Sequence, residues 1–365
     1  MGVDLPRSRH PGAGACDQCG KPGAARRFRS EVCRMKKRVL LEVNALKTTF
    51  STRAGPVTAV DGVSLTLNEG ECLGVVGESG SGKSVTFASV MGLVRANGRI
   101  EEGEIRFMGR DLRAMSAEEL RLVRGREIAM TMQDALTALN PSLRIDEQLA
   151  EMMEAHLDDL PVFGPARKRA IRDRSVEMLR LVGIPSPEAR LQQYPHEFSG
   201  GMRQRIMIAI ALACRPKLLI ADEPTTALDV TIQAQVLDLI SDLRRELGMS
   251  VVFITHDLGI VAEHCDRVMV MYAGQVVEEG ETSEIIEQCR HPYTRALLAS
   301  IPRPELRGQS LNPIPGNVPD LRDVTNECRF RSRCAYAVPA CSRPVMMREI
   351  APGRKTRCIR DGELA

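Results

Sequence analysis

Short runs of hydrophobic residues recur along the middle of the chain, and each has the length of a β-strand. From Leu40 onward they read VLLEV, LGVVG, LLIAD, VVFIT and RVMVM, with stretches of helical periodicity between them. Strands that are apolar throughout and alternate with helices are typical of a parallel sheet covered by helices. The pattern therefore predicts an α/β domain with a largely parallel sheet over residues 38–290.

A different pattern distinguishes residues 140–195, which contain no strand-like run. The segments IDEQLAEMMEAHL and RKRAIRDRSVEMLRLVGI place apolar residues at helical spacing. We expect a helical subdomain at residues 140–200 within the α/β domain. The apolar stripe of its first helix either contacts a partner or packs the helix onto its own domain, and both alternatives stay open; the stripe consists of Ile145, Leu149, Met152 or Met153, and Leu157.

The two ends of the chain are basic and lack a hydrophobic period. Residues 1–38 carry ten basic and three acidic side chains, and residues 302–365 carry twelve and seven. The first of these segments is rich in Gly, Pro and Arg, so we predict a disordered tail at residues 1–37. A proline-rich connector and a cysteine-containing segment make up residues 291–365 and are expected to form a C-terminal extension.

Composition excludes some classes of protein. The chain is 43% hydrophobic and 27% charged, which is an ordinary globular balance. Only 3% of residues are aromatic and Trp is absent, which argues against a stacking surface for single-stranded nucleic acid, and the net charge of +3 adds no argument for nucleic acid. Without a long apolar run or a signal-like start, the chain is expected to be a soluble, cytosolic protein. Eleven cysteines in that compartment indicate core thiols, metal ligands or redox groups.

The segment VVGESGSGKS carries the first chemical signal. It fits G-x-x-x-x-G-K-[ST] between an apolar strand and a helix, the context that a phosphate-binding P-loop requires. Lys83 is expected to reach the β- and γ-phosphates and Ser84 to hold Mg²⁺. The predicted nucleotide-binding residues here are Gly77, Glu78, Ser79, Gly80, Ser81, Gly82, Lys83, Ser84 and Val85.

The strand in KLLIADEP ends in two acids. Asp222 suits a Mg²⁺ ligand, and Glu223 suits the group that orients or deprotonates the attacking water. The alternative is a solvated loop at the end of a strand. The preceding P-loop favours the catalytic interpretation.

In HEFSGGMRQRIMIAIALA, a second potential anion site begins a helix. Ser199, Gly200 and Gly201 expose N–H groups at a helix N-terminus, although one triphosphate does not need two such sites. This segment resembles the signature motif of ABC-type ATPases. The resemblance implies that it contacts the γ-phosphate bound by a second ATPase subunit, so that ATP lies between two nucleotide-binding domains.

Further motifs of this family follow in order. By resemblance, Gln133 senses Mg²⁺ and water, Asp229 lies at the subunit junction, and His256 holds the γ-phosphate. Phe50 resembles the aromatic residue that stacks on adenine, although an aromatic residue at a strand end can equally belong to the core. The resemblance thus implies a P-loop NTPase of the ABC type, with Glu223, His256 and Gln133 as its catalytic residues and ATP and Mg²⁺ as its cofactors.

The subfamily signal lies in TALNPSL, YPHEFSGGMRQR, RHPYTRALL and the closing cysteines, which resemble ATP-binding subunits of bacterial dipeptide and oligopeptide importers. The resemblance implies ATP-driven peptide import at the cytoplasmic face of the membrane. The implied partners are a second, homologous ATPase subunit, two permease subunits and, indirectly, an extracytoplasmic binding protein. Nickel or another small solute is an alternative cargo. A DNA-repair or translation ATPase is the alternative class, but no coiled coil or second ATPase half supports it.

Four cysteines near the C-terminus form a candidate metal site. Their spacing fits neither a usual zinc pair nor a ferredoxin run, so it leaves the metal open; they are Cys328, Cys334, Cys341 and Cys358. The subfamily resemblance implies a 4Fe-4S cluster on this set, whereas unliganded core thiols are the alternative. Because these cysteines lie outside every ATP motif, we expect the cluster to fold the tail or tune coupling and to take no part in hydrolysis.

The N-terminal tail also contains cysteines. Cys16 and Cys19 have the spacing of a zinc knuckle, but only Cys33 follows as a third ligand, so a disordered tail is the favoured interpretation. A translation start at Met35 is another open possibility, because MKKRVLLEV resembles the start of family members.

Overall fold

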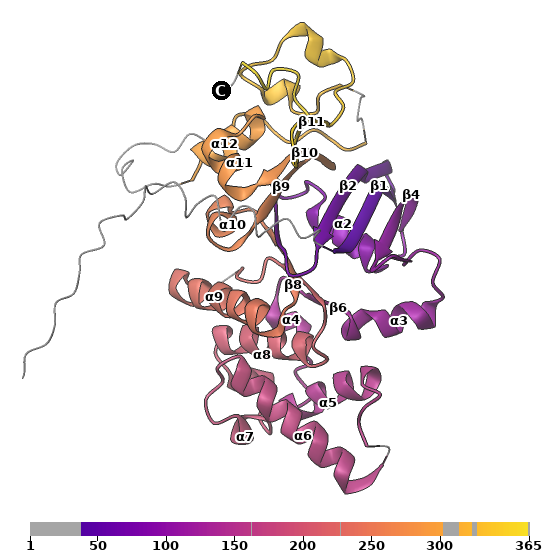
Figure 1. Cartoon of the computed structure of the whole chain (residues 1–365), viewed down its shortest axis with the longest axis vertical. Coiled ribbons are helices and arrows are strands. Elements are labelled where there is room, and N and C mark those ends of the chain that lie inside the picture. The colour runs from indigo at the N-terminus through magenta and orange to yellow at the C-terminus, as the bar shows by residue number, and fades with distance from the viewer. Residues whose placement is uncertain (1–37, 162, 227, 302–313, 323–326, 364–365) are drawn as a thin grey trace, which may run out of the picture. The chain divides into compact units, whose positions relative to one another are not determined.

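Two β-sheets and the helices packed on them organise the chain (Figure 1). The computed structural model describes residues 38–161, 163–226, 228–301, 314–322 and 327–363. The predictions of a disordered tail and of a zinc knuckle at Cys16, Cys19 and Cys33 lie outside these residues. Residues 39–365 form one unit, and this unit contains both sheets.

The larger sheet has eight strands in the order β11-β12-β10-β9-β3-β8-β7-β6. Its five parallel strands are β9 (Arg267–Tyr272), β3 (Cys72–Val76), β8 (Ser250–Thr255), β7 (Leu218–Asp222) and β6 (Ile128–Thr131). The three antiparallel strands are β10 (Gln275–Glu281), β12 (Arg354–Thr356) and β11 (Arg348–Ala351). Five residues in the middle of β10 are buried, and the short β11–β12 hairpin pairs along its otherwise open edge. The C-terminal extension therefore completes the sheet of the α/β domain.

The smaller sheet is antiparallel, with the order β2-β1-β4-β5. Its strands are β1 (Val39–Thr52), β2 (Gly55–Asn68), β4 (Gly98–Phe107) and β5 (Arg110–Asp111). The prediction that VLLEV belongs to the parallel sheet is wrong, because this run lies in β1. Only two residues join β1 to β2, and so short a connection forces antiparallel pairing.

Helices cover the sheets and form a separate region low in Figure 1. They are α2 (Lys83–Val90), α3 (Ala117–Arg126), α4 (Ala135–Ala138), α5 (Ile145–His156), α6 (Gly164–Leu181), α7 (Pro187–Arg190), α8 (Gly200–Leu212), α9 (Val230–Leu247), α10 (Leu258–His264), α11 (Thr282–Gln288) and α12 (Pro292–Ala299). Short 3₁₀ turns are η1 (Pro195–Glu197), η3 (Arg331–Arg333) and η4 (Pro339–Ser342). The described residues of 140–195 contain helices and no strand, as their pattern predicts.

Alternate residues of the larger sheet enter two hydrophobic cores. In β3, Leu73 and Val75 pack with β1, β2 and α2, whereas Cys72 and Val76 pack on the side of α8, α9 and α10. β7 and β8 alternate in the same way. Burial on both faces explains why these strands are continuous apolar runs.

The apolar stripe of α5 packs largely inside its own domain. Ile145, Leu149 and Met153 are fully buried, whereas Met152 and Leu157 are half-buried. The packing alternative thus accounts for three positions. Met152 remains available to line a surface cavity.

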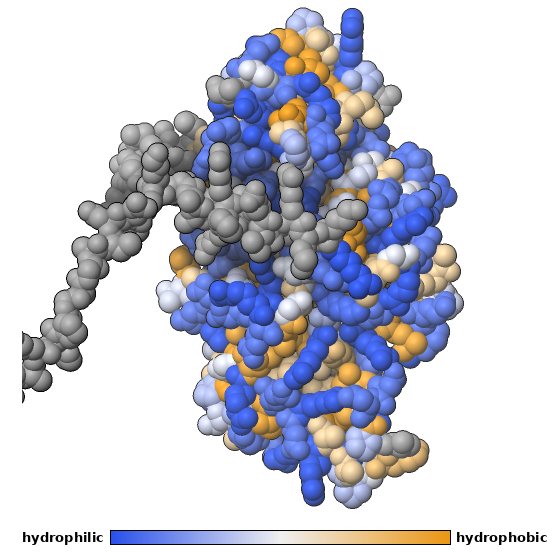
Figure 2. Space-filling view, in the orientation of Figure 1, coloured by the Kyte–Doolittle hydropathy of each residue, from blue (hydrophilic) through white to orange (hydrophobic). Residues whose placement is uncertain are grey.

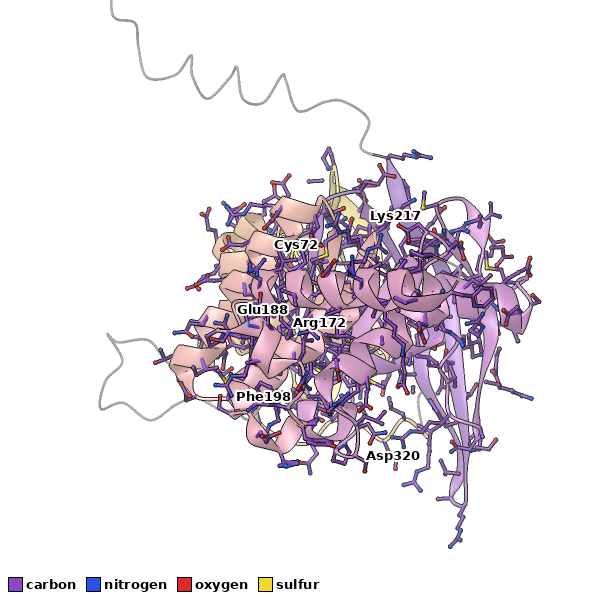
Figure 3. The ribbon with its side chains drawn as sticks, turned by 90° about the horizontal axis from the view of Figure 1, so that it is seen from below. Cys72, Arg172, Glu188, Phe198, Lys217 and Asp320 are labelled. Carbon is purple, nitrogen blue, oxygen red and sulfur yellow. The ribbon has the colours of Figure 1, made fainter. Side chains whose placement is uncertain are left out.

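The surface is mostly hydrophilic. On the face seen in Figure 2 the hydrophobic residues gather in small patches, several of them in the lower part, where α5 to α8 lie. Seen from below, charged side chains such as Arg172 of α6 and Glu188 of α7 stand on the exposed helix surfaces (Figure 3). In the part of the chain that the structure describes, no helix has the length and apolar character to cross a membrane.

Candidate functional site

The P-loop, residues 77–84, leads from the buried strand β3 into helix α2. Gly82 has a φ of 97°, and a Cβ there would lie 2.4 Å from the carbonyl oxygen of Ala59. A Cβ on Gly77 would lie 2.1 Å from the carbonyl oxygen of Met271. Glycine is therefore required at both positions, where the loop is strongly curved and closely packed. The loop ends at a helix N-terminus, where free N–H groups and the helix dipole attract anions.

Lys83 lies at the centre of this loop. Its Nζ donates to the carbonyl oxygens of Gly77 at 2.6 Å and Glu78 at 3.0 Å, and the residue is 5% exposed. Burial lowers the pKa of Lys83, while the nearby carboxylates of Glu223, Asp222 and Glu78 raise it. The ammonium group thus stands among the carboxylates at the end of the parallel strands.

Ser84 and Asp222 meet across the site. Ser84 Oγ donates to Asp222 Oδ1 at 2.9 Å, although 138 positions separate them. Burial raises the pKa of Asp222, while the Ser84 hydrogen bond and Lys83 oppose that shift. Oxygen atoms of this kind suit Mg²⁺, which uses few protein ligands and completes its shell with phosphate and water. No group of three or more His, Cys, Asp or Glu side chains among the described residues is arranged to hold a metal ion.

Glu223 has three side-chain partners at the end of β7. Gln133 Nε2 donates to its Oε2 at 2.8 Å, Thr226 Oγ1 donates to the same oxygen at 3.0 Å, and His256 Nδ1 lies 3.5 Å from its Oε1. Glu223 has a φ of 45°, a conformation that costs free energy for a residue other than glycine. The structure thus brings together the three residues that the sequence predicts to be catalytic.

Ser199, Gly200 and Gly201 lie elsewhere, at the N-terminus of α8. Ser199 Oγ accepts from the Met202 N–H at 3.4 Å, and the hydrogen bonds of residues 199–201 do not reach the P-loop in this single chain. Gly201 packs against Ile232 of α9, and the exposed Asp229 caps the same helix by accepting from the Ile232 N–H at 3.0 Å. The signature motif and Asp229 are therefore close to one another and exposed to solvent.

Phe50 lies on β1 in the smaller sheet. Its half-buried ring packs against Gly98 of β4, so closely that a Cβ on Gly98 would lie 2.5 Å from the ring. The ring therefore has a packing role within its own sheet. The predicted contact with adenine stays a prediction.

The four predicted cysteine ligands line one small cavity of about 20 Å³. Apolar and basic side chains share its wall; they include Phe330, Val345, Ile359, Arg331, Arg357 and Arg360. Burial raises the pKa of Cys358 to about 11, and the other three thiols add to the shift. All eight cysteines among the described residues are free thiols. The four cysteines thus share one cavity, but no group arranged to hold a metal ion is found among the described residues, and the 4Fe-4S cluster stays a prediction.

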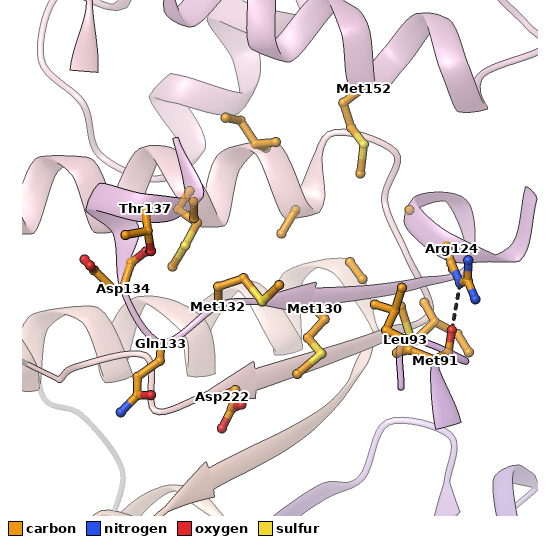
Figure 4. A pocket seen from close by; sticks show the side chains of 17 residues that line it. Met91, Leu93, Arg124, Met130, Met132, Gln133, Asp134, Thr137, Met152 and Asp222 are labelled. Atoms are coloured by element: carbon orange, nitrogen blue, oxygen red, sulfur yellow. Dashed lines mark hydrogen bonds between the residues drawn. The ribbon is translucent and has the colours of Figure 1, made fainter. Parts of the chain in front are cut away.

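A second cavity, of about 750 Å³, opens beside Gln133 and Asp222 (Figure 4). Methionines line much of it, namely Met91, Met130, Met132, Met152 and Met207. Arg124 closes one end, where its Nε donates to the Met91 carbonyl oxygen at 2.7 Å. Met132 is 53% exposed, which is unusual for so large an apolar side chain. The sequence hypothesis missed this cavity because its lining comes from β6, α4, α5 and α8.

Two further contacts to the P-loop were also missed. Tyr293 Oη accepts from the Glu78 N–H at 2.8 Å, and Arg333 pairs with the Glu78 carboxylate at 2.7 Å. Tyr293 belongs to RHPYTRALL, one of the subfamily segments, and Arg333 directly precedes Cys334. The sequence therefore marked the segment that contains Tyr293 and the neighbourhood of Arg333, but it gave no signal for their contacts with the P-loop.

Comparisons with known proteins agree with this geometry. Residues 60–226 match the family model described as ABC transporter, and residues 277–341 match the model of the oligopeptide/dipeptide transporter C-terminal region. The chain is 47% identical to the oligopeptide transport ATP-binding protein OppD of Salmonella typhimurium, over 89% of this chain and 95% of that protein. It is 48% identical to the dipeptide transport ATP-binding protein DppD of Bacillus subtilis, over 87% and 91% of the two chains. Among solved structures, the ATP-binding cassette MJ0796 in a dimeric post-hydrolysis state with ADP and Pi has a TM-score of 0.59 at 26% identity, covering 67% of this chain and 99% of that one.

Proposed function

Because the chain belongs to the family of ABC transporter ATP-binding proteins, we propose that it is the ATP-hydrolysing subunit of an importer for di- or oligopeptides. The observation that carries the proposal is the similarity to peptide-transport ATPases over nearly their whole length, together with the match of the C-terminal region. The intact P-loop and the cluster around Glu223 support an active enzyme. Nickel or another small solute is the alternative cargo.

The P-loop is the proposed site for the triphosphate. Its N–H groups and Lys83 bind the β- and γ-phosphates, and Val85 extends this wall into α2. Ser84 and Asp222 hold Mg²⁺, with Gln133 as a further ligand. The 2.9 Å hydrogen bond between Ser84 and Asp222 supports this assignment, because both oxygens already converge on one point. Mg²⁺ would neutralise charge on the phosphates.

Glu223 is the proposed residue that acts on water. The water oxygen bonds to the γ-phosphorus, the bond to the ADP oxygen breaks, and Glu223 receives the water proton. Gln133 and Thr226 hold one carboxylate oxygen, so the other is directed toward His256. His256 is proposed to contact the γ-phosphate, and the 68% exposure of its side chain beside Glu223 supports this role. These assignments make Glu223 a catalytic residue and Gln133 and His256 its neighbours at the reacting phosphate.

A second ATPase subunit completes the site in this proposal. Ser199, Gly200 and Gly201 are turned to solvent beside Asp229, and they lack a hydrogen bond to the P-loop of their own chain. On a partner they would cover the γ-phosphate, while Phe50 would stack on the adenine. The resemblance to a cassette solved as a dimer supports this arrangement.

The methionine-lined cavity is the proposed docking point for a permease subunit. An exposed apolar surface rimmed by polar residues marks an interaction site. It lies directly beside Gln133, so a cytoplasmic segment of the permease seated there would sense the nucleotide site. The chain would then lie at the cytoplasmic face of the membrane, and the extracytoplasmic binding protein would act on it only through the permease.

The four C-terminal thiols are proposed to hold a 4Fe-4S cluster. Cys328, Cys334, Cys341 and Cys358 line one cavity whose basic wall suits an anionic cluster. The bound cluster would cross-link the segment and supply a one-electron redox centre. Without a cluster, Cys358 is a protonated thiol at neutral pH, because its pKa is raised to about 11. Cluster binding requires the thiolate and would therefore release this proton. Anaerobically purified protein should be brown and contain iron, whereas colourless protein with stoichiometric zinc would contradict the assignment.

Two substitutions test the enzyme in the complex assembled with its permease. Glu223→Gln should retain ATP affinity and lose turnover, because the carboxylate acts on water. Lys83→Ala should weaken ATP binding itself. Glu246→Gln, an exchange at an exposed site on α9, is the matched control. Hydrolysis at the wild-type rate by the Glu223 variant would show that this residue is not catalytic. Peptide uptake that does not depend on ATP would contradict the proposed function.

A further inference from the structure

The cysteine segment, residues 328–341, contacts the P-loop through a single arginine. Arg333 Nη1 and Nη2 donate to the two carboxylate oxygens of Glu78 at 2.7 and 3.0 Å. The Arg333 side chain is 4% exposed and that of Glu78 is 28% exposed. A bidentate contact between an arginine and a carboxylate is among the strongest polar contacts in proteins, and here the arginine is buried. It joins residues 255 positions apart.

Every N–H group of the Arg333 guanidinium has a partner. Besides Glu78, it donates to the carbonyl oxygens of Pro315 at 2.9 Å and Ile314 at 3.2 Å, and to Tyr272 Oη at 3.3 Å. Its Cζ atom lies 5.8 Å from the centre of the Tyr272 ring. A guanidinium has five N–H groups, and these five contacts use all of them. Arg333 is therefore fixed in one orientation against Glu78.

Glu78 is the second residue of the P-loop and is held from several sides. Its N–H donates to Tyr293 Oη at 2.8 Å, and its carbonyl oxygen accepts from Lys83 Nζ at 3.0 Å. The carboxylate contributes a negative charge close to a loop that binds an anion, and it lies near enough to affect the pKa of Lys83. An unpaired carboxylate here would repel phosphate. Arg333 supplies the compensating charge.

A second arginine of the segment, Arg329, reaches the loop only indirectly. Arg329 pairs with Asp61 and donates to the carbonyl oxygen of Ala273. The next residue, Gly274, donates its N–H to the carbonyl oxygen of Ser81 in the P-loop at 2.9 Å. The segment therefore reaches the loop both directly, through Arg333, and through one intermediate backbone contact.

We propose that Arg333 is a positioning residue for the P-loop, through which the fold of the cysteine segment sets the affinity for nucleotide. The inference rests on the proposed function only in taking the bound anion to be ATP. Arg333 neutralises the Glu78 carboxylate, so that this charge does not oppose phosphate binding. The turn η3 ends at Arg333, and Cys334 follows directly. The expectation that the cysteines take no part in hydrolysis stays a prediction; what the structure adds is that Arg333, the residue before Cys334, contacts the P-loop.

Arg333→Met tests the proposal, since it keeps most of the side-chain volume and removes the charge. The dissociation constant for ATP should rise about tenfold or more, while the turnover number at saturating ATP in the assembled complex stays within about twofold. Arg333→Lys keeps the positive charge but loses the bidentate contact with the carboxylate, so the dissociation constant for ATP should rise by an intermediate amount. Arg343→Met, at an exposed site in the same extension, should leave ATP binding unchanged.

The deciding measurement is rescue by a second substitution. If Arg333 acts by compensating the carboxylate, Glu78→Gln combined with Arg333→Met should return the dissociation constant to within about threefold of the Glu78→Gln value. A purely structural role would leave the double variant as weak as Arg333→Met. If Arg333→Met does not fold, the Arg333→Lys and Glu78→Gln pair answers the same question.

The outcomes separate this proposal from the assignment of function. Wild-type protein that binds no ATP would refute the proposed function. Wild-type protein that binds ATP with Arg333→Met equally tight would overturn only the role of Arg333, as would a double variant without rescue. Iron analysis of the same preparations tests the cluster independently.

Discussion

Tyr293→Phe removes a single oxygen atom from beneath the P-loop. Tyr293 is fully buried, and its Oη accepts the Glu78 N–H at 2.8 Å. The ring also packs against Tyr272 at 4.6 Å and Phe330 at 5.3 Å between centroids, and phenylalanine retains both contacts. The substitution therefore isolates one hydrogen bond.

The size of the expected loss depends on the amide that is left behind. A partly buried N–H without a partner costs about 1–3 kcal/mol, and part of the Glu78 amide can reach water, so we expect a loss of about 1–2 kcal/mol in the free energy of unfolding. Arg333 and Lys83 still hold Glu78 in the variant. The affinity for ATP should therefore fall by about threefold to tenfold, which is about 0.7–1.4 kcal/mol.

Urea unfolding followed by circular dichroism and equilibrium ATP binding measure the two effects. Tyr194→Phe, at a site 38% exposed, controls for the loss of a hydroxyl group at the surface. Stability and ATP affinity both equal to wild type in Tyr293→Phe would show that the hydroxyl does not support the loop. A loss of stability with unchanged affinity would separate the fold from the nucleotide site.

Three further predictions concern protons and partners. The pKa of the buried His291 is lowered to about 3, so below about pH 6.5 the unfolded state binds a proton that the folded state does not. The free energy of unfolding should therefore fall by about 1.4 kcal/mol per pH unit below pH 6.5. Urea titrations of His291→Asn at several pH values should lack this slope. Because burial raises the pKa of Asp222, this carboxylate should be protonated at a higher pH than an ordinary aspartate, and Mg·ATP binding should weaken as the pH falls. Asp222→Asn should bind Mg·ATP weakly and with less pH dependence. Equal pH profiles for the variant and the wild type would contradict this. Met132→Glu places a charge on the proposed docking cavity and should reduce co-purification with the permease while ATP binding by the isolated chain is retained; undiminished co-purification would remove the cavity from that role.

The residues of the nucleotide site were more predictable from the sequence than the contacts that hold the P-loop in place. The P-loop is one continuous stretch, and Asp222 and Glu223 end a strand that lies in the same parallel sheet, so the carboxyl ends of β3 and β7 had to meet at one edge. Topology thus brought Ser84 to Asp222 without any local signal joining them. The pairing of Arg333 with Glu78 has no such rule behind it, because the extension reaches the loop through a path that neither periodicity nor strand order specifies.

One wrong prediction and one open alternative also have physical causes. VLLEV is as apolar as the parallel strands, and burial on both sides of β1 produces the same run in an antiparallel sheet. The stripe of α5 left two alternatives open, because the same periodicity arises at an interface and when a helix packs on its own neighbours, as Ile145 and Leu149 do. Neither ambiguity can be resolved from apolar spacing alone.

The β11–β12 hairpin covers one edge of the larger sheet. Without it, the outermost strand of the larger sheet would be β10, which would present a row of unpaired N–H and C=O groups beside a buried apolar surface. Such an edge is a template on which a second molecule can add a strand. The hairpin replaces it with β11, four residues long and carrying the exposed charges of Arg348 and Glu349. We therefore expect truncation of the C-terminal extension to expose this edge and to favour self-association.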